Sequence, residues 1–238
     1  MITVNSVVIA RKGSKGLPSK CMLPIEGKSL LEHVIGWSTS LSNENIRVKT
    51  IVSTDIEGLS NLCDHYGAHY HQRDPALAAD AVRVEDVVYD AVRNDLDADF
   101  ISMLYGNIPL RYDNLFHEPI EFLLNNPDVD AVLTFQNVEK FNPAWMTDFQ
   151  DSGLLPESWT EKAFRRQDLK QFMIHDGHTI LFKSAYFLNY MKHQNRTGKM
   201  YEQFGWNIRP WVHDELVIDI DTKKDYLMAR GLMSIPKE

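Results

Sequence analysis

The sequence predicts an α/β fold, with one domain built on a mostly parallel, mixed β-sheet flanked by helices. Two observations predict this class. Short apolar runs alternate with longer segments whose apolar residues recur every three or four positions, and charged or turn residues bound each run. The chain has 238 residues, of which 44% are hydrophobic, so it is long enough to bury one full core over residues 1–238.

The first half of the chain supplies a regular β-α-β alternation. Buried strands are predicted at residues 7–10, 48–54, 99–105 and 130–135. Helices are predicted at residues 29–41, 56–67, 82–96 and 114–126, and Gly67 stands where a glycine would end the second of them. Because strands joined by helices run parallel and are covered on both faces, continuous apolar strands of this kind favour a predominantly parallel sheet.

The second half departs from this alternation. Residues 137–175 mix aromatic, charged and turn residues without a period, so we expect a small excursion that packs on a partner subunit or covers a site. Order returns with a predicted strand at 178–184, a helix at 184–192, and a strand followed by a helix within 215–233.

The overall charge excludes two classes of partner. The chain carries 25 Lys and Arg against 33 Asp and Glu, a net charge of −8, which would repel nucleic acid and anionic membranes at long range. Only Cys21 and Cys63 are present, without the spacing of metal ligands or of a disulfide framework. The apolar run at 7–10 is too short for a secretory signal, and no segment approaches a membrane span, so we expect a cytoplasmic protein.

A cationic, glycine-containing loop follows the first predicted strand. The stretch "ARKGSKGLPSK" (10–20) holds four cations, which are Arg11, Lys12, Lys15 and Lys20. Such a loop at the carboxyl end of a strand lies at the usual ligand crevice of an open α/β sheet, where backbone N–H groups and cations can hold an anion. Gly13 and Gly16 are three apart, so the loop is neither a P-loop nor a dinucleotide fingerprint. A solvated basic turn is the alternative interpretation.

A carboxylate pair stands near the end of the sequence. In "VIDID" (217–221), Asp219 and Asp221 are two apart in a predicted strand, so both should face one side while Ile220 faces the other. Two carboxylates on one side suit a hard cation that also takes phosphate oxygens. The alternative is that they are solvated residues opening the next helix, a role that Asp225 fits as part of a capping box with Thr222.

Five stretches, in order, resemble the sugar-acid cytidylyltransferases, a family that includes the CMP-sialic acid synthetases and, more distantly, the CMP-Kdo synthetases. They are "ARKGSKGLPSK" with "LPIEGKSLLEH", then "IVSTD" (51–55), "YGAHYHQRDPALAAD" (66–80), "IPLR" (108–111) and "DIDTKKD" (219–225). The resemblance covers nearly the whole chain. It implies a Rossmann-like nucleotidyltransferase domain that binds CTP and Mg²⁺ and forms a homodimer through the excursion at 137–175.

The resemblance also implies a role for each matching residue. The catalytic cations would be Arg11, Lys15 and Lys20. The nucleotide-binding residues would be Ala10, Arg11, Gly13, Ser14, Lys20, Arg73, Asp80 and Asn107. The metal ligands would be Asp219 and Asp221, and Arg166 matches a residue that would reach the acceptor. Tyr105, His175 and Asp176 do not match the pattern but stand close to where the acceptor should lie, so we expect them to bind it as well; for His175 a role in a turn is the alternative. Charge compensation by cations and a metal is what transfer of a phosphoryl-type group requires.

The chain departs from the family pattern at several positions. Asn107 stands where the Kdo enzymes have a metal-binding Asp, and Ile174 stands where a second acceptor-binding Arg is expected. Ala79 and the residues after Asp80 also differ, and Cys21 replaces an Asn as a small buried thiol. The loss of one bidentate Arg argues against N-acetylneuraminate itself as the acceptor.

We therefore expect a Mg²⁺-dependent enzyme that transfers CMP from CTP to a 3-deoxy-2-keto sugar acid and releases pyrophosphate. The acceptor would be a Kdo-like octulosonate or a nonulosonate such as legionaminic or pseudaminic acid, activated for a cell-surface glycan or lipopolysaccharide. Two alternatives stay open: a nucleotidyltransferase for another base or acceptor, and a relative that binds nucleotide or sugar without turnover.

Overall fold

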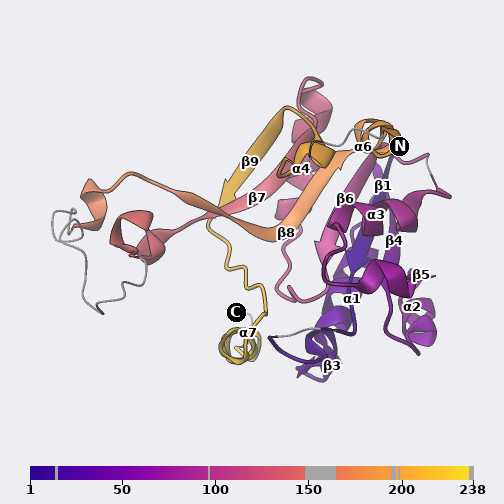
Figure 1. Ribbon diagram of the computed structural model, residues 1–238, viewed down its shortest axis with the longest axis horizontal. Helices are drawn as coiled ribbons and strands as arrows, with labels where there is room; N and C mark the ends of the chain where they lie inside the picture. The colour runs from indigo at the N-terminus through magenta and orange to yellow at the C-terminus, as the bar shows by residue number, and fades with distance from the viewer. Residues whose placement is uncertain (14–15, 96, 148–164, 194–196, 198, 236–238) are drawn as a thin grey trace.

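A computed structural model describes residues 1–13, 16–95, 97–147, 165–193, 197 and 199–235. Its centre is a seven-stranded sheet of order β5-β4-β1-β6-β8-β7-β9 (Figure 1). The strands are β1 (Ile2–Ile9), β4 (Ile46–Thr54), β5 (His69–Gln72), β6 (Phe100–Tyr105), β7 (Ala131–Asn137), β8 (Met173–Lys183) and β9 (Ile208–His213). Strand β8 is antiparallel to both its neighbours and the other pairings are parallel, which confirms the mostly parallel, mixed sheet.

Helices cover both faces of the sheet. Among the described residues they are α1 (Leu30–Ser40), α2 (Ser60–Tyr66), α3 (Val84–Val92), α4 (Asn114–Asn125), α6 (Ser184–Lys192) and α7 (Lys223–Met233). Val7 of β1 packs in a buried cluster with α3 and α6, whereas its neighbour Val8 packs in one with α1 and α2. This alternation places apolar side chains on both faces, as expected for strands buried on two sides.

The first strand is longer than predicted, because its amino-terminal half carries polar side chains that are nevertheless buried. Asn5 donates from Nδ2 to the Asp95 carbonyl at 2.9 Å, and the hydroxyl of Ser6 lies 2.7 Å from that of Ser38. These hydrogen bonds satisfy the polar groups inside the fold, so the strand includes polar residues that precede the predicted apolar run.

The excursion at 137–175 is an arm. Strands β7 and β8 form an antiparallel ribbon that runs past a register shift between Leu133 and Phe135 to the pair Asn137 and Met173, and β9 accompanies β7 as far as Gln136. The ribbon leads to three short 3₁₀ helices, Glu139–Phe141, Pro143–Trp145 and Arg166–Asp168. Figure 1 shows the arm extending away from the helices and the rest of the sheet.

One predicted strand is absent. Residues 214–221 form no strand, and the segment instead crosses the carboxyl edge of the sheet before α7. The alternation of apolar residues in this segment reflects packing and not strand pairing: Ile218 and Ile220 are buried in a small cluster with Ile25 and Leu30.

The carboxyl ends of the central strands lie level with one another. Ile9 of β1 pairs with Ser53 of β4 and Tyr105 of β6, so the segments that follow these strands begin side by side. Gly106 allows the closest approach: its N–H donates to the Ile9 carbonyl at 2.9 Å, and a Cβ here would lie 3.1 Å from that oxygen. Within the described residues, no helix combines the length and the apolar character needed to cross a membrane.

Candidate active site

The cationic loop leaves β1 at the buried Ala10 and is tied to two other segments of the predicted site. Arg11 forms an ion pair with Asp80, with 2.7 Å between Nη1 and Oδ1. The backbone N–H of Lys12 donates to Oδ1 of Asp55, also at 2.7 Å. Three motifs that are far apart in the sequence therefore meet at one edge of the sheet. Gly13 is exposed, and Ser14 and Lys15 lie outside the described residues.

Arg73 forms the floor beneath this loop. It is only 4% exposed, and its guanidinium donates from Nη2 to the Ser53 carbonyl at 2.5 Å. Burial lowers the pKa of Arg73, and the neighbouring Asp55 partly offsets this. Burial likewise raises the pKa of the Cys21 thiol, so Cys21 is a protonated packing residue beside the site, as the sequence predicted.

The carboxylate pair lies at the same edge. Asp219 and Asp221 alternate with the buried Ile218 and Ile220, so both acidic residues stand on the open side of the segment, although no strand forms there. Asp219 keeps part of its surface open to solvent, but partial burial of its carboxyl group and the like charge of Asp221 raise its pKa. A cation nearby would favour the ionised form of both groups.

Two residues predicted to bind nucleotide contact this pair. Lys20 forms an ion pair with Asp221, and Nδ2 of Asn107 donates to Oδ1 of Asp219. The loop also approaches the backbone of Asp221 closely, because a Cβ at Gly16 would lie only 2.8 Å from the Asp221 carbonyl oxygen. The cationic loop and the carboxylate pair thus form one site.

The donors present fit a hard divalent cation. Across the described ranges, no group of three or more His, Cys, Asp or Glu side chains is arranged to hold a metal alone. Two carboxylates next to a cationic loop leave positions for water and for phosphate oxygens, which is how Mg²⁺ is commonly held with a nucleotide. The residues that would hold it are Asp219 and Asp221.

The residues predicted to bind an acceptor divide into two groups. Tyr105 and His175 lie near the site, where burial, assisted by the charge of Asp219, raises the pKa of Tyr105 to about 12. Nδ1 of His175 is 3.2 Å from the hydroxyl of Tyr201, a residue that the sequence did not single out. Partial burial lowers the pKa of His175, so its ring is neutral at neutral pH.

Asp176 does not present its carboxylate to an acceptor. The residue is 7% exposed and accepts hydrogen bonds from His213 Nε2 and Thr134 Oγ1 at 2.7 Å and from the His178 N–H at 2.8 Å. Burial alone would raise its pKa, but these hydrogen bonds outweigh burial and lower it. Asp176 is therefore a buried structural residue next to His175. Its burial could not be predicted from the sequence pattern.

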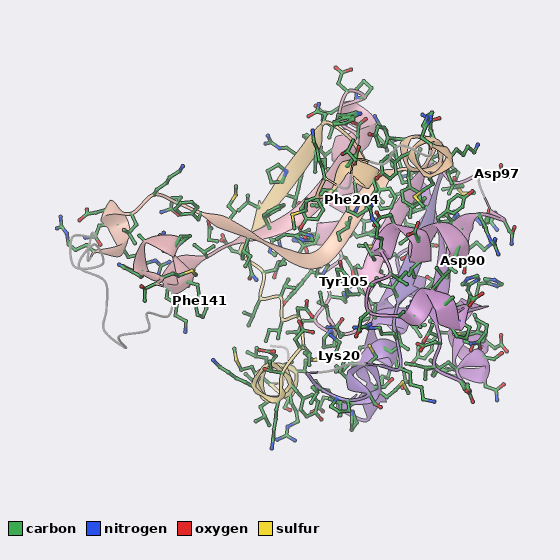
Figure 2. All side chains as sticks on the ribbon, viewed as in Figure 1. Lys20, Asp90, Asp97, Tyr105, Phe141 and Phe204 are labelled. Carbon is green, nitrogen blue, oxygen red and sulfur yellow. The ribbon has the colours of Figure 1, made fainter. Side chains whose placement is uncertain are left out.

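Arg166 is not brought to the site within one chain. It lies in the arm, exposed, with Nη2 3.1 Å from a carboxylate oxygen of Glu139. Figure 2 shows Phe141 of the same arm far from Lys20 and Tyr105. An acceptor contact by Arg166 would therefore have to be made in a second copy of the chain.

Sequence reasoning also missed a buried cation. Arg111 lies beside the end of β6 and the middle of β8. It donates to the carbonyls of Tyr105 (2.7 Å) and His178, and its guanidinium is 5.4 Å from the Trp37 ring centroid. Burial of its guanidinium lowers its pKa to about 9, with the charges of Asp176 and Asp219 opposing the shift. The only signal in the sequence was its place at the end of "IPLR".

Comparison with known proteins accounts for this arrangement. The family model for cytidylyltransferases matches residues 6–228, a span that holds the loop, the strand ends and the carboxylate pair. This chain belongs to the cytidylyltransferase family. The resemblance found in the sequence is thereby confirmed at the level of the cytidylyltransferase family.

Individual relatives agree with the family match. The chain is 29% identical over 230 residues to an N-acylneuraminate cytidylyltransferase of Streptococcus agalactiae serotype V, covering 94% of this cytidylyltransferase and 52% of that relative. It is 28% identical over 132 residues to a Helicobacter pylori protein named as a pseudaminic acid cytidylyltransferase and a hydrolase, covering 54% of this chain and 25% of that one. The chain spans about half the length, or less, of these curated relatives.

A solved structure confirms the fold. The CMP:2-keto-3-deoxy-manno-octonic acid synthetase complexed with CTP superposes with a TM-score of 0.70 at 18% identity, over 98% of each chain. At that identity the likeness shows the nucleotidyltransferase fold alone.

Proposed function

We propose that this cytidylyltransferase transfers CMP from CTP to a 3-deoxy-2-keto sugar acid, with Mg²⁺, and releases pyrophosphate. The observation that carries the proposal is the meeting of Lys20 with Asp221 at the carboxyl edge of the sheet. At this edge, a side chain that would bind phosphate, Lys20, contacts one carboxylate of the pair that would bind a divalent cation. Such a site can hold the triphosphate and compensate its charge as it reacts.

The geometry supports a division of roles. Arg11 and Lys20 would bind phosphate oxygens and stabilise the charge that develops as the bridging oxygen leaves the α-phosphorus with pyrophosphate. A hydroxyl oxygen of the acceptor would form the new bond to that phosphorus and lose its proton. Mg²⁺ bound by Asp219 and Asp221 would supply further charge compensation. Arg73 would keep the floor of the site in place through Ser53.

The choice of acceptor is supported by the names of the relatives and by one side chain. N-acylneuraminate, pseudaminic acid and 2-keto-3-deoxy-manno-octonic acid, named in three similar proteins, are all sugar acids. Ile174 is exposed on the ribbon and offers no charge to a carboxylate. A Kdo-like octulosonate, or a nonulosonate such as legionaminic or pseudaminic acid, is therefore favoured over N-acetylneuraminate, and the product would be a donor for a cell-surface glycan.

A homodimer formed through the arm is part of the proposal. Exposed apolar side chains gather on the arm, namely Phe141, Met146, Phe172, Met173 and Ile174. A protruding element of this composition is better buried against another protein surface than left in water. Dimerisation would also allow Arg166 of one protomer to approach the acceptor of its partner.

The test is pyrophosphate release with Mg²⁺ and each of CTP, UTP, GTP and ATP, against a panel of 2-keto-3-deoxy sugar acids. Release that requires both CTP and one acceptor would establish the reaction and its substrates together. A CTP-dependent rise in melting temperature without release for any acceptor would support a binding protein without turnover. Pyrophosphate release with UTP, GTP or ATP in place of CTP would support the alternative, a nucleotidyltransferase that uses another base.

A further inference from the structure

The side chain of Asn107 forms hydrogen bonds with both Asp219 and the backbone of Ile220. The residue follows β6 directly, after Tyr105 and Gly106, and is 6% exposed. Its Nδ2 donates one hydrogen bond to Oδ1 of Asp219 and another to the Ile220 carbonyl at 3.1 Å. Its own carbonyl accepts from the Ile220 N–H at 3.2 Å.

These contacts do for residues 217–221 what a neighbouring strand would do. The segment is outside the sheet, yet both backbone polar groups of Ile220 are satisfied by Asn107. Ile220 itself is fully buried, which anchors the segment from below. Buried backbone groups need hydrogen-bond partners, and Asn107 supplies them here. Asn107 thus holds the acidic segment against the end of β6.

The chemistry of the side chain matters. An amide has two N–H donors and no net charge, so it can hold a carboxylate without repelling a cation that binds the other carboxylate oxygen. An ionised Asp at 107 would donate neither hydrogen bond and would face two acceptors, whereas Lys or Arg would compete with the cation for Asp219.

We propose that Asn107 is a positioning residue for the cation site, which it serves by fixing the orientation of Asp219 rather than by contacting nucleotide. The proposal rests on the proposed function, since it assumes that Asp219 binds the divalent cation. It replaces the expectation from the sequence that Asn107 contacts the nucleotide. Partners of metal ligands commonly change metal affinity by about 10- to 100-fold when they are removed.

The test uses the full chain and Mn²⁺ as the probe, with binding followed by electron paramagnetic resonance in the absence of nucleotide and acceptor. Asn107→Ala is expected to weaken Mn²⁺ binding by about tenfold or more. Once an acceptor is known, the KM of Asn107→Ala for CTP should differ from that of the wild type by less than about twofold at saturating Mg²⁺. A high Mg²⁺ concentration fills the cation site even when its affinity is reduced.

Asn5→Ala is the matched control. Asn5 is also buried and also donates from Nδ2 to a backbone carbonyl, but at the opposite end of the sheet. It should leave Mn²⁺ affinity unchanged. If Asn107→Ala does not fold, Asn107→Ser, which keeps a donor of shorter reach, carries the same comparison.

Unchanged Mn²⁺ affinity in Asn107→Ala, or a raised KM for CTP without a change in Mn²⁺ affinity, would overturn the proposal. A wild-type chain that binds no Mn²⁺ would overturn it as well. If the wild-type chain binds Mn²⁺ and Asn107→Ala weakens that binding, but no pair of nucleotide and acceptor yields pyrophosphate, the proposed reaction is contradicted and the role of Asn107 stands.

Discussion

Lys20 and Asp221, 201 positions apart in the chain, form an ion pair at the carboxyl edge of the sheet. Each has a role in the proposed reaction that requires it to exchange this partner for a ligand. Lys20 would turn to a phosphate oxygen and Asp221 to a cation, so the pair keeps two opposite charges compensated until the ligands arrive. Because each charged group always has a partner, either the other side chain or a ligand, the free-energy cost of desolvating it is limited.

Lys20→Gln and Asp221→Asn are therefore expected to separate stability from turnover. The Asp221 side chain is 66% exposed, so loss of the pair should change the free energy of unfolding by less than about 1 kcal/mol. Turnover should fall by about 100-fold or more, because each group would stabilise charge in the transition state. Urea unfolding and pyrophosphate release measure the two effects, and wild-type turnover in Asp221→Asn would refute the assignment of the metal ligand.

Gly16→Ala should weaken CTP binding through a steric effect. The added Cβ would meet the Asp221 carbonyl oxygen at 2.8 Å, so the loop or the acidic segment must move apart. The expected rise in the Kd for CTP, measured by calorimetry with Mg²⁺ present, is about fivefold or more. Gly231→Ala is the control, since Gly231 lies in α7 outside the predicted site and a Cβ there has no described atom within 4 Å. Equal effects of the two substitutions would show that the contact with Asp221 is unimportant.

His178 predicts how stability depends on pH. Burial, together with the charges of Arg111 and His213, lowers its pKa from 6.5 to about 2, so it is neutral in the folded protein. The unfolded chain takes up the proton below pH 6.5 and the folded chain does not, so stability must fall as the pH falls from 6.5 toward 2. The loss from this residue approaches about 1.4 kcal/mol per pH unit.

Urea unfolding of wild type and His178→Asn between pH 7.5 and about 5 checks this slope. In the variant, the free energy of unfolding should fall less steeply as the pH is lowered, because one fewer proton is taken up on unfolding. Some pH dependence should remain, since the pKa of His175 is also lowered. Identical slopes for the two proteins would mean that His178 is protonated in the fold.

Arg111→Gln should destabilise the fold. The substitution leaves the carbonyls of Tyr105 and His178 without their buried donor and removes the guanidinium from the Trp37 ring. The expected loss is about 2–4 kcal/mol in the free energy of unfolding. Arg209→Gln is a matched control, because Arg209 also lies over a ring, that of Phe122, but is exposed. A loss as small as in that control would show that other groups satisfy the carbonyls.

The arm predicts the oligomeric state. Phe141→Asp places a charge on a side chain that is 62% exposed in one chain and that would be buried in the proposed dimer. Sedimentation velocity should find a dimer for wild type and a monomer for the variant, because an unpaired buried charge is costly. Leu124→Asp, at a side chain of α4 that is 46% exposed and outside the arm, should leave the protein dimeric. A wild-type monomer would remove the arm from the proposed interface.

The loop and the strand ends could be predicted because their positions follow from periodicity and from the parallel course of the strands. For the acidic pair, the alternation with Ile218 and Ile220 predicted the shared side correctly. Strand β9 was missed because it contains Pro210 and Arg209, which the sheet tolerates only because β9 is an edge strand. The strand expected at 215–221 was wrong, since burial of alternate residues there reflects packing on α1 and α7 and needs no strand partner.

Two site assignments depended on contacts that no local pattern contains. Asp176 looked like a free carboxylate beside the acceptor, but Thr134 and His213, from two other strands, enclose it. Arg166 could not be placed because the length and direction of the arm are set by the β7–β8 ribbon. In both cases the deciding partner is distant in the sequence.

The attachment of residues 217–221 by Asn107, outside the sheet, also bears on the order in which a newly made chain becomes active. All seven strands of the sheet pair with one another without this segment, so the sheet can form while its edge still has no acidic pair. The ability to bind a cation then depends on the docking of a few residues onto the paired strands. A chain in which that docking has not occurred would have its sheet formed and no cation site.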